Sequence, residues 1–593
     1  MKYSLLLLPL LIILLLGSVR AYSVSRTAYI FGVEQLSNGS VIGVPSQVTV
    51  RITNGSGQVF VAATPLVQTS TQAQAIVSTY TACFLLNFNC NKYNFYFNIS
   101  SSSPEVGGPS EGAALSVLVM AGLLNVSINP SVAMTGVANP DGSIGLIGDA
   151  SQKSEAAALV GIKEFLYPLG NNISSQAQTF DYLHGEKTIP VSNIFQAFQI
   201  FTGYKINITP VVKLPYIYQV FQNYSFQQIE NYQSALLENL SNYSGFNSEV
   251  YQLIAIAKAA ISKEKLLASQ NLAYVASSLA VNTSLPDLIE AQVLAYNLSL
   301  PSLISQLNSS KQVYINKIIY KQVNSSTEIF LLTGLDRIHQ GEVYLSNAIN
   351  DLNNNLYSEA LTNYALALTK FVTAVYWDQF LSNSSTPFNQ SSLQNLAYYY
   401  FNLANSYYYY SQEITSYSNP LSNYYLNESQ YNLQNHNYVY SLFESLNSIA
   451  ESQLAIESVN LLSSESSAEI IPLSLYSDKL AIYYAEKAGS IPILGITNYL
   501  LANSSYYSNY TILEFSSFSR VYAQFEEALV SGYEPFYSLS KSPISYNNSF
   551  NLEGILLFTL LGIAIGAIVE GLIYEFFIIK KIKSNLRKKH GRV

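Results

Sequence analysis

The hydrophobic pattern of this 593-residue chain changes near residue 207, and this change limits what the chain can fold into. Residues 207–216 carry two prolines and separate two kinds of sequence. Beyond them, apolar residues recur at helical spacing, three and four positions apart, over more than about 300 residues. One such stripe comprises Leu361, Tyr364, Ala365, Leu368, Phe371 and Val372. We therefore predict a linker at 207–216 and an all-helical domain at 217–550.

The part before the linker has a mixed pattern. Between Tyr29 and Ser100, alternating residues such as Gln47–Ile52 and short apolar runs such as Val59–Ala62 are typical of strands. From Ser110 to Gly203, segments typical of strands and of helices follow one another. The sequence predicts an α+β domain at 22–206.

Two residues of the mixed part form a reactive combination. Ser110 lies in Val-Gly-Gly-Pro-Ser-Glu-Gly (106–112), and Lys153 follows 43 residues later, in a segment typical of a turn entering a helix. A serine hydroxyl is a poor nucleophile until a base takes its proton. Lysine can be that base where burial lowers the pKa of its amine. Backbone amides at the start of the helix predicted at 111–124 would offer hydrogen bonds to an oxyanion.

The same residues also fit a purely structural interpretation. Gly-Pro-Ser before an apolar run is an ordinary helix start, with the serine as its cap. A lysine further along the chain is usually a solvated surface residue. The residue types alone leave both interpretations open.

The segment 108–168 resembles, without a gap, the proteolytic domain of the Lon family (S16), whose members are peptidases with a Ser–Lys dyad. The family's Gly-Pro-Ser-Ala-Gly resembles Gly108–Gly112, and its Val-Ala-Met-Thr-Gly resembles Val132–Gly136. Its Pro-Ile-Gly-Gly is similar to Leu146–Asp149, shortly before Lys153. Its Ala-Gly-Ile-Lys is similar to Val160–Lys163. Matches at several fixed spacings make this resemblance specific.

The resemblance extends more loosely over residues 24–205, and it implies a role for each matched residue. Ser110 matches the nucleophile, and Lys153 matches the general base. Thr135 matches a threonine that helps to hold the lysine amine. Gly108 lies in the loop that frames the oxyanion site in the family.

The sequence also departs from the family pattern. An acidic residue often precedes the family's Gly-Pro-Ser, where this chain has Gly107, and the glutamate of Thr-Gly-Glu is Val137 here. The ATPase of Lon needs a phosphate-binding loop, Gly-x4-Gly-Lys-Ser/Thr, which the sequence does not contain. We therefore expect proteolysis without ATP, or powered by another protein, and no cofactor. By arrangement the chain looks closest to archaeal membrane-anchored, Lon-like serine proteases that lack the ATPase.

Both ends of the sequence are apolar. Residues 1–21 are typical of a signal peptide. Residues 554–579 are apolar enough to predict a transmembrane helix, and the basic residues at 580–593 favour the cytoplasmic side. We expect a single-pass protein of the cell membrane with an extracellular body and a basic cytoplasmic tail. Gly562 and Gly566 have a spacing that permits two such helices to pack closely, which leaves a homo-oligomer open.

The composition agrees with a place outside the cell. Only 11% of the residues are charged, whereas 48 are tyrosine, which would suit an archaeal protein in hot acid. The 19 Asn-x-Ser/Thr sequons predict a glycoprotein. Cys83 and Cys90 are the only cysteines, and outside the cytosol we expect a disulfide between them rather than a metal site.

Two functions from different classes remain. The first is a membrane-anchored serine endopeptidase that acts on protein or peptide substrates through Ser110 and Lys153, with no metal and no nucleic acid. The second is a non-catalytic surface scaffold that keeps a protease-like domain for binding. The presence of Ser110, Lys153 and Thr135 together favours the first.

Overall fold

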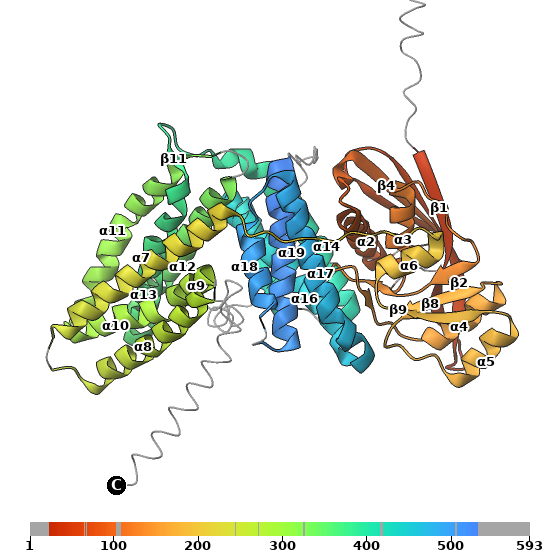
Figure 1. The fold of residues 1–593 in the computed structure, drawn as a ribbon, viewed down its shortest axis with the longest axis horizontal. Coiled ribbons are helices and arrows are strands. Elements are labelled where there is room, and N and C mark those ends of the chain that lie inside the picture. The colour runs from red at the N-terminus through yellow and green to blue at the C-terminus, as the bar shows by residue number, and fades with distance from the viewer. Residues whose placement is uncertain are drawn as a thin grey trace, which may run out of the picture. The chain divides into compact units, whose positions relative to one another are not determined.

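The computed structural model describes residues 23–531, except 65, 67, 102–107, 244, 271, 324–326, 416–418 and 505–506. The chain forms two compact units (Figure 1). The first comprises residues up to 140 together with 144–206, and the second comprises 141–143 together with the residues from 207 onward. Residues 204–215 carry no helix or strand, and α7 begins at Tyr216.

The strands of the first unit form two main sheets. The larger sheet has the order β1-β2-β4-β3, in which β3 is parallel to β4 and the other neighbours are antiparallel. Its strands are β1 (Ser23–Gln35), β2 (Val41–Asn54), β3 (Val59–Thr64) and β4 (Tyr93–Ser101). The smaller sheet is parallel, with the order β5-β8-β9. Its strands are β5 (Val132–Met134), β8 (Glu164–Pro168) and β9 (Lys187–Val191), and a short hairpin joins β6 (Val137–Ala138) to β7 (Ile144–Gly145).

The α-helices in the described part of the first unit are α2 (Thr69–Leu86), α3 (Gly112–Leu123), α4 (Ala150–Leu159), α5 (Ser175–Leu183) and α6 (Ile194–Thr202). Helix α3 is the centre of this unit, because each of its 12 residues is buried. It packs against β1, β2, α2 and α6. A helix that is apolar all round is stable only when it is covered on every side, and the sequence of α3, rich in alanine and valine, meets that condition. The helix predicted after Ser110 is thereby confirmed.

Helix α2 differs from the prediction, because strands were expected throughout Tyr29–Ser100. The segment is rich in threonine and other β-branched residues, which favour strands. In the structure the Thr79 hydroxyl donates to the Ala75 carbonyl at 2.7 Å, a bond within the helix that satisfies a polar side chain among apolar neighbours. Packing of α2 against α3 and β3 decides the conformation, and the helix ends where Asn87 adopts a left-handed conformation (φ 55°).

The described part of the second unit consists almost entirely of helices. The longer helices are α7 (Tyr216–Ser241), α8 (Ser248–Ser269), α9 (Ala273–Asn282), α10 (Ser284–Ala295), α11 (Leu300–Ile319), α12 (Glu328–Asn353), α13 (Tyr357–Ala374), α14 (Gln394–Thr415), α15 (Pro420–Gln434), α16 (Tyr438–Ser458), α17 (Ser464–Ala488), α18 (Ile493–Ala502) and α19 (Asn509–Ser531). The remaining elements are the pair β10 (Lys321–Gln322) and β11 (Ser382–Asn383) and the 3-10 helices η2 (Val375–Phe380), η3 (Gln390–Leu393) and η4 (Val459–Leu462). An α+β part and a large helical part are thus both present.

Serines join α15 to α16 at two levels. At one level, the Ser422 hydroxyl lies 3.1 Å from that of Ser448 and 2.7 Å from that of Ser452. The second level lies seven residues along α15, where the Ser429 hydroxyl lies 2.7 Å from that of Ser445. Small side chains let the two helices approach closely, and each buried hydroxyl is satisfied by another.

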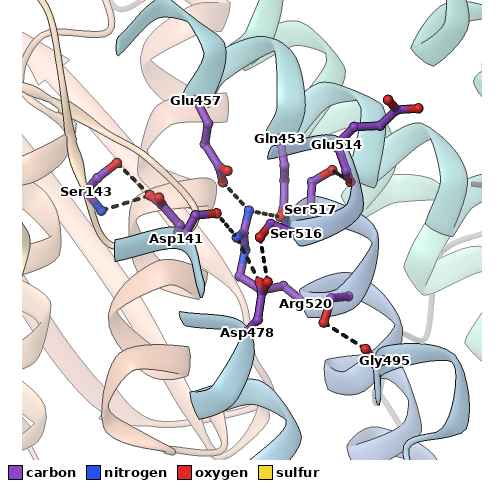
Figure 2. A network of polar contacts seen from close by, with 12 residues as sticks. Asp141, Ser143, Gln453, Glu457, Asp478, Gly495, Glu514, Ser516, Ser517 and Arg520 are labelled. Atoms are coloured by element: carbon purple, nitrogen blue, oxygen red, sulfur yellow. Dashed lines mark hydrogen bonds and ion pairs between the residues drawn. The ribbon is translucent and has the colours of Figure 1, made fainter. Parts of the chain in front are cut away.

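Arg520 of α19 is the largest polar side chain in the core of the second unit, where it is fully buried (Figure 2). Its guanidinium forms ion pairs with Glu457 of α16 and with Asp478 of α17, the latter at 3.3 Å. It also donates to the Ser474 hydroxyl at 2.9 Å and to the Gln453 side-chain oxygen at 3.4 Å. Burial raises the pKa of Asp478 to about 7, although the charge of Arg520 opposes this shift.

The short segment 141–143 also belongs to the second unit. The Ser143 amide and hydroxyl donate to the Asp141 carboxylate at 2.9 and 2.6 Å (Figure 2). Burial raises the pKa of Asp141, and the nearby positive charge of Arg520 lowers it. Arg520 therefore acts as the counter-charge for several buried carboxylates at once.

The predicted single-pass membrane arrangement requires correction. Across the described range, no helix combines the length and the apolar character needed to cross a bilayer. The helix predicted at 554–579, the signal peptide at 1–21 and the tail at 580–593 all lie outside the described residues. The fold class that the structure supports is therefore an α+β unit and a large helical unit, without the predicted membrane helix. The predicted location, with an extracellular body and a cytoplasmic tail, is not supported.

Replacing Arg520 by leucine will strongly destabilise the second unit, because Glu457 and Asp478 would stay buried without a cation. We expect a loss of about 3–5 kcal/mol in the free energy of unfolding, measured by urea denaturation. The triple variant Arg520→Leu/Glu457→Gln/Asp478→Asn removes the cation together with its two ion-pair partners and should lose much less. Equal losses in the single and triple variants would contradict the assigned role of the ion pairs.

Candidate active site

Ser110 lies in the turn immediately before α3, and its main chain is fixed by the segment that follows β5. The Ser110 carbonyl oxygen accepts hydrogen bonds from the Gly136 amide at 2.7 Å and from the Thr135 hydroxyl at 3.1 Å. In return, the Ala113 amide in the first turn of α3 donates to the Gly136 carbonyl at 3.0 Å. Ser110 itself is half-buried, so its main chain is fixed while the residue stays partly exposed.

Two glycines shape the backbone around Ser110. Gly108 has a φ of +100°, a conformation that side chains other than glycine rarely adopt. Gly136 lies so close to β7 that a Cβ atom there would be 2.4 Å from Cγ2 of Ile144. The absence of a side chain at position 136 lets this part of the backbone pass close to Ile144.

Lys153 reaches Ser110 from α4. This helix begins after Asp149, whose φ of 56° turns the chain into the helix. The Asp149 carbonyl accepts a hydrogen bond from the Lys153 amide at 3.2 Å. The side chain of Lys153 is only 4% exposed. Its Nζ atom lies 2.7 Å from the Ser110 Oγ atom, so the fold brings together two residues that are 43 positions apart.

The environment of Lys153 lowers the pKa of its amine. Burial lowers the pKa of the lysine, because the charged form loses its hydration. The negative charges of Glu111 and Asp149 act in the opposite direction and raise the pKa. Burial is the larger influence, so the net change is downward.

Glu111 is a site residue that the sequence did not indicate. Its side chain is 6% exposed, and one carboxylate oxygen accepts the Ser110 hydroxyl at 3.3 Å. The other oxygen accepts the Gln74 side-chain amide of α2 at 3.3 Å. The only signal in the sequence was that Glu111 stands where the resembling Lon motif has alanine, and Gln74 lies outside the matched segment.

Thr135 and the amides at the start of α3 differ from the expectation. The hydroxyl of Thr135 donates to the main chain of Ser110, whereas the resemblance gave it the lysine amine as partner. The amides of Gly112 and Ala113 donate to the carbonyls of Pro109 and Gly136, at 3.4 and 3.0 Å. These two amides are engaged within the turn and are not free to hold an oxyanion.

Cys83 and Cys90 form a disulfide with Cα atoms 5.9 Å apart. Cys83 lies in the last turn of α2, and Cys90 begins the 3-10 helix η1 (Cys90–Lys92) before β4. The bond therefore links the end of α2 to the 3-10 helix that precedes β4, and the disulfide expected between these two cysteines is present. The disulfide anchors α2, the helix to which Gln74 of the site belongs.

This geometry defines a class of site, in which the hydroxyl of a half-buried serine contacts a buried amine at the start of a buried helix. An amine that is neutral can accept the hydroxyl proton, and the alkoxide so formed can attack a carbonyl carbon. Nucleophilic catalysis of acyl transfer is the chemistry that such a pair can perform.

The comparisons with known proteins point in the same direction, but for only a small part of the chain. No protein-family model matches the chain. The chain is similar to the Lon protease of Neorickettsia sennetsu, with 27% identity over 119 residues, which cover 18% of this chain and 14% of that protein. The chain thus spans a small fraction of the length of this relative. The similarity supports a Lon-related family for the aligned part and nothing narrower.

Replacing Gly136 by alanine will destabilise the first unit, because the new methyl group would overlap Ile144. We expect a loss of about 1–3 kcal/mol in the free energy of unfolding, measured by urea denaturation. Gly148→Ala is the matched control, since a Cβ atom at Gly148 meets no atom within 4 Å. Equal stability of the two variants would contradict the close approach at Gly136.

Proposed function

We propose that the first unit is a serine endopeptidase, in which Ser110 is the nucleophile and Lys153 is the general base. The observation that carries this proposal is the 2.7 Å contact between Nζ of Lys153 and Oγ of Ser110, with the amine buried and its pKa lowered. The similarity of part of the chain to a Lon protease supports the same chemistry. Protein or peptide substrates, and a reaction that needs neither ATP nor a cofactor, are parts of the proposal.

The proposed reaction has two halves. In the first, the neutral Lys153 amine takes the proton of the Ser110 hydroxyl while Oγ forms a bond to the peptide carbonyl carbon. The lysine ammonium then gives this proton to the leaving nitrogen, and the C–N bond breaks. In the second half, Lys153 takes a proton from water, and the hydroxide attacks the acyl group on Ser110. The proton returns to Ser110 as the C–O bond breaks, so both residues are regenerated.

The proposal is tested with the purified full chain and an internally quenched peptide or unfolded casein, without ATP, from about pH 3 to about pH 8. Ser110→Ala and Lys153→Ala should each lower kcat/KM by at least about 10⁴-fold, since loss of one member disables the pair. The reason is that neither a hydroxyl without a base nor a base without a hydroxyl can form the acyl intermediate. Cleavage is followed by fluorescence and by mass spectrometry of the products.

Lys163→Ala provides the matched control, because Lys163 is an exposed lysine of the same unit. It should cleave at the rate of the unsubstituted chain. Cleavage that survives in both Ser110→Ala and Lys153→Ala would contradict the assigned pair. No cleavage of either substrate at any of these pH values would favour the alternative function, a non-catalytic scaffold with a protease-like domain.

A further inference from the structure

The Ser110 hydroxyl has two partners of opposite character. It accepts a hydrogen bond from the Lys153 amine at 2.7 Å and donates one to the Glu111 carboxylate at 3.3 Å. In this arrangement the proton of the hydroxyl points toward the carboxylate and away from the amine. The proposed reaction requires the reverse, with the proton directed at a neutral amine.

Glu111 is held firmly in this position. Its side chain is almost fully buried, and Gln74 of α2 donates to its second carboxylate oxygen at 3.3 Å. Helix α2 is anchored by the disulfide between Cys83 and Cys90. The carboxylate therefore cannot turn away to solvent without breaking a buried hydrogen bond.

An ionised carboxylate at this point favours the ammonium form of the lysine. Opposite charges stabilise each other, and the effect is greater in a buried site than in water. Glu111 thus opposes the burial of Lys153, which alone would favour the neutral amine. The negative charge also competes with the amine for the hydroxyl proton.

We propose that Glu111 is a positioning residue that regulates the Ser110–Lys153 site: its carboxylate holds the hydroxyl and the ammonium in a resting arrangement and so sets the pH above which the lysine acts as base. This inference rests on the proposed function of the pair. It adds a residue and a form of regulation that the resembling Lon motif, with alanine at this position, does not contain.

Among the residues that the structure describes, two charged groups act on the pKa of Lys153. Glu111 and Asp149, at the start of α4, both raise the pKa of Lys153 against the effect of burial. On the other side, burial is the larger influence on Glu111 and raises its pKa, and the charge of Lys153 opposes this shift and favours the ionised carboxylate. Helix α2 contributes the neutral Gln74. Of the two carboxylates, Glu111 alone also contacts the Ser110 hydroxyl.

Glu111→Gln removes the charge and keeps the size of the side chain. A base acts in its neutral form, so kcat/KM rises with pH through the pKa of Lys153. Loss of the negative charge lowers this pKa, so the rise in activity moves to lower pH. We expect a shift of about one pH unit, which is about a tenfold gain in kcat/KM on the acidic side.

A second measurement does not depend on catalysis. The full chain is acetylated with a trace of acetic anhydride over a range of pH, and mass spectrometry measures the labelled fraction of the peptide that contains Lys153. Only the neutral amine reacts, so the midpoint reports the pKa of this lysine directly. The midpoint should fall in Glu111→Gln by the same amount as the activity profile.

Glu155→Gln is the matched control. Glu155 lies on the same helix as Lys153, two positions further on, where its side chain points to another face. It should leave both midpoints unchanged. Glu111→Ala serves as a second variant and should shift both midpoints in the same direction as Glu111→Gln. Thermal denaturation confirms that each variant is folded before it is compared.

An unchanged or raised labelling midpoint in folded Glu111→Gln would overturn the inference. If no form of the chain cleaves peptides but the labelling midpoint still falls, the electrostatic role of Glu111 stands and the proposed peptidase function fails. If peptides are cleaved through Ser110 and Lys153 but both midpoints stay in place, the function stands and the role of Glu111 fails.

Discussion

The complete burial of α3 is the constraint on which the site of the first unit depends. An apolar helix with no solvated face must be covered by the sheet and by neighbouring helices, and this covering fixes its first turn in space. Ser110 and Glu111 lie immediately before this first turn, and hydrogen bonds from Thr135 and Gly136 hold the carbonyl of Ser110 from the other side. The position of the hydroxyl follows from packing and not from a flexible loop.

Burial then determines the chemistry of the charged groups. The amine of Lys153 enters a space where its charged form loses hydration, and the nearby Glu111 carboxylate restores part of that loss. The two effects have opposite signs at the same amine. The balance between them decides the protonation state of Lys153, which is why a single neighbouring carboxylate can control the site.

Much of the first unit could be predicted from its sequence. The apolar run after Ser110 and the alanines after Lys153 predicted α3 and α4, because the spacing of their apolar residues is helical. Helix α2 could not be predicted in this way, since its β-branched residues favour strands and packing against α3 and β3 decides the outcome. Glu111 was missed because a single residue carries no pattern. Its role arises from contacts with Gln74 and Ser110 that form only in the fold.

In the second unit, too, the local sequence pattern predicts the helices but not the contacts between them. Helical spacing predicted its helices, but the counter-charge role of Arg520 joins residues from α16, α17 and α19, which no local pattern connects. Its serine contacts between α15 and α16 likewise follow from helix packing.

Acylation tests most directly whether the Lys153 amine activates the Ser110 hydroxyl. The full chain is treated with p-nitrophenyl acetate, and the acetylated residue is located by mass spectrometry. We predict one fast-reacting hydroxyl, that of Ser110, and no fast acylation in Lys153→Ala. Acylation of Ser110 at the same rate in Lys153→Ala, or no preference for Ser110 among the serines, would contradict this activation.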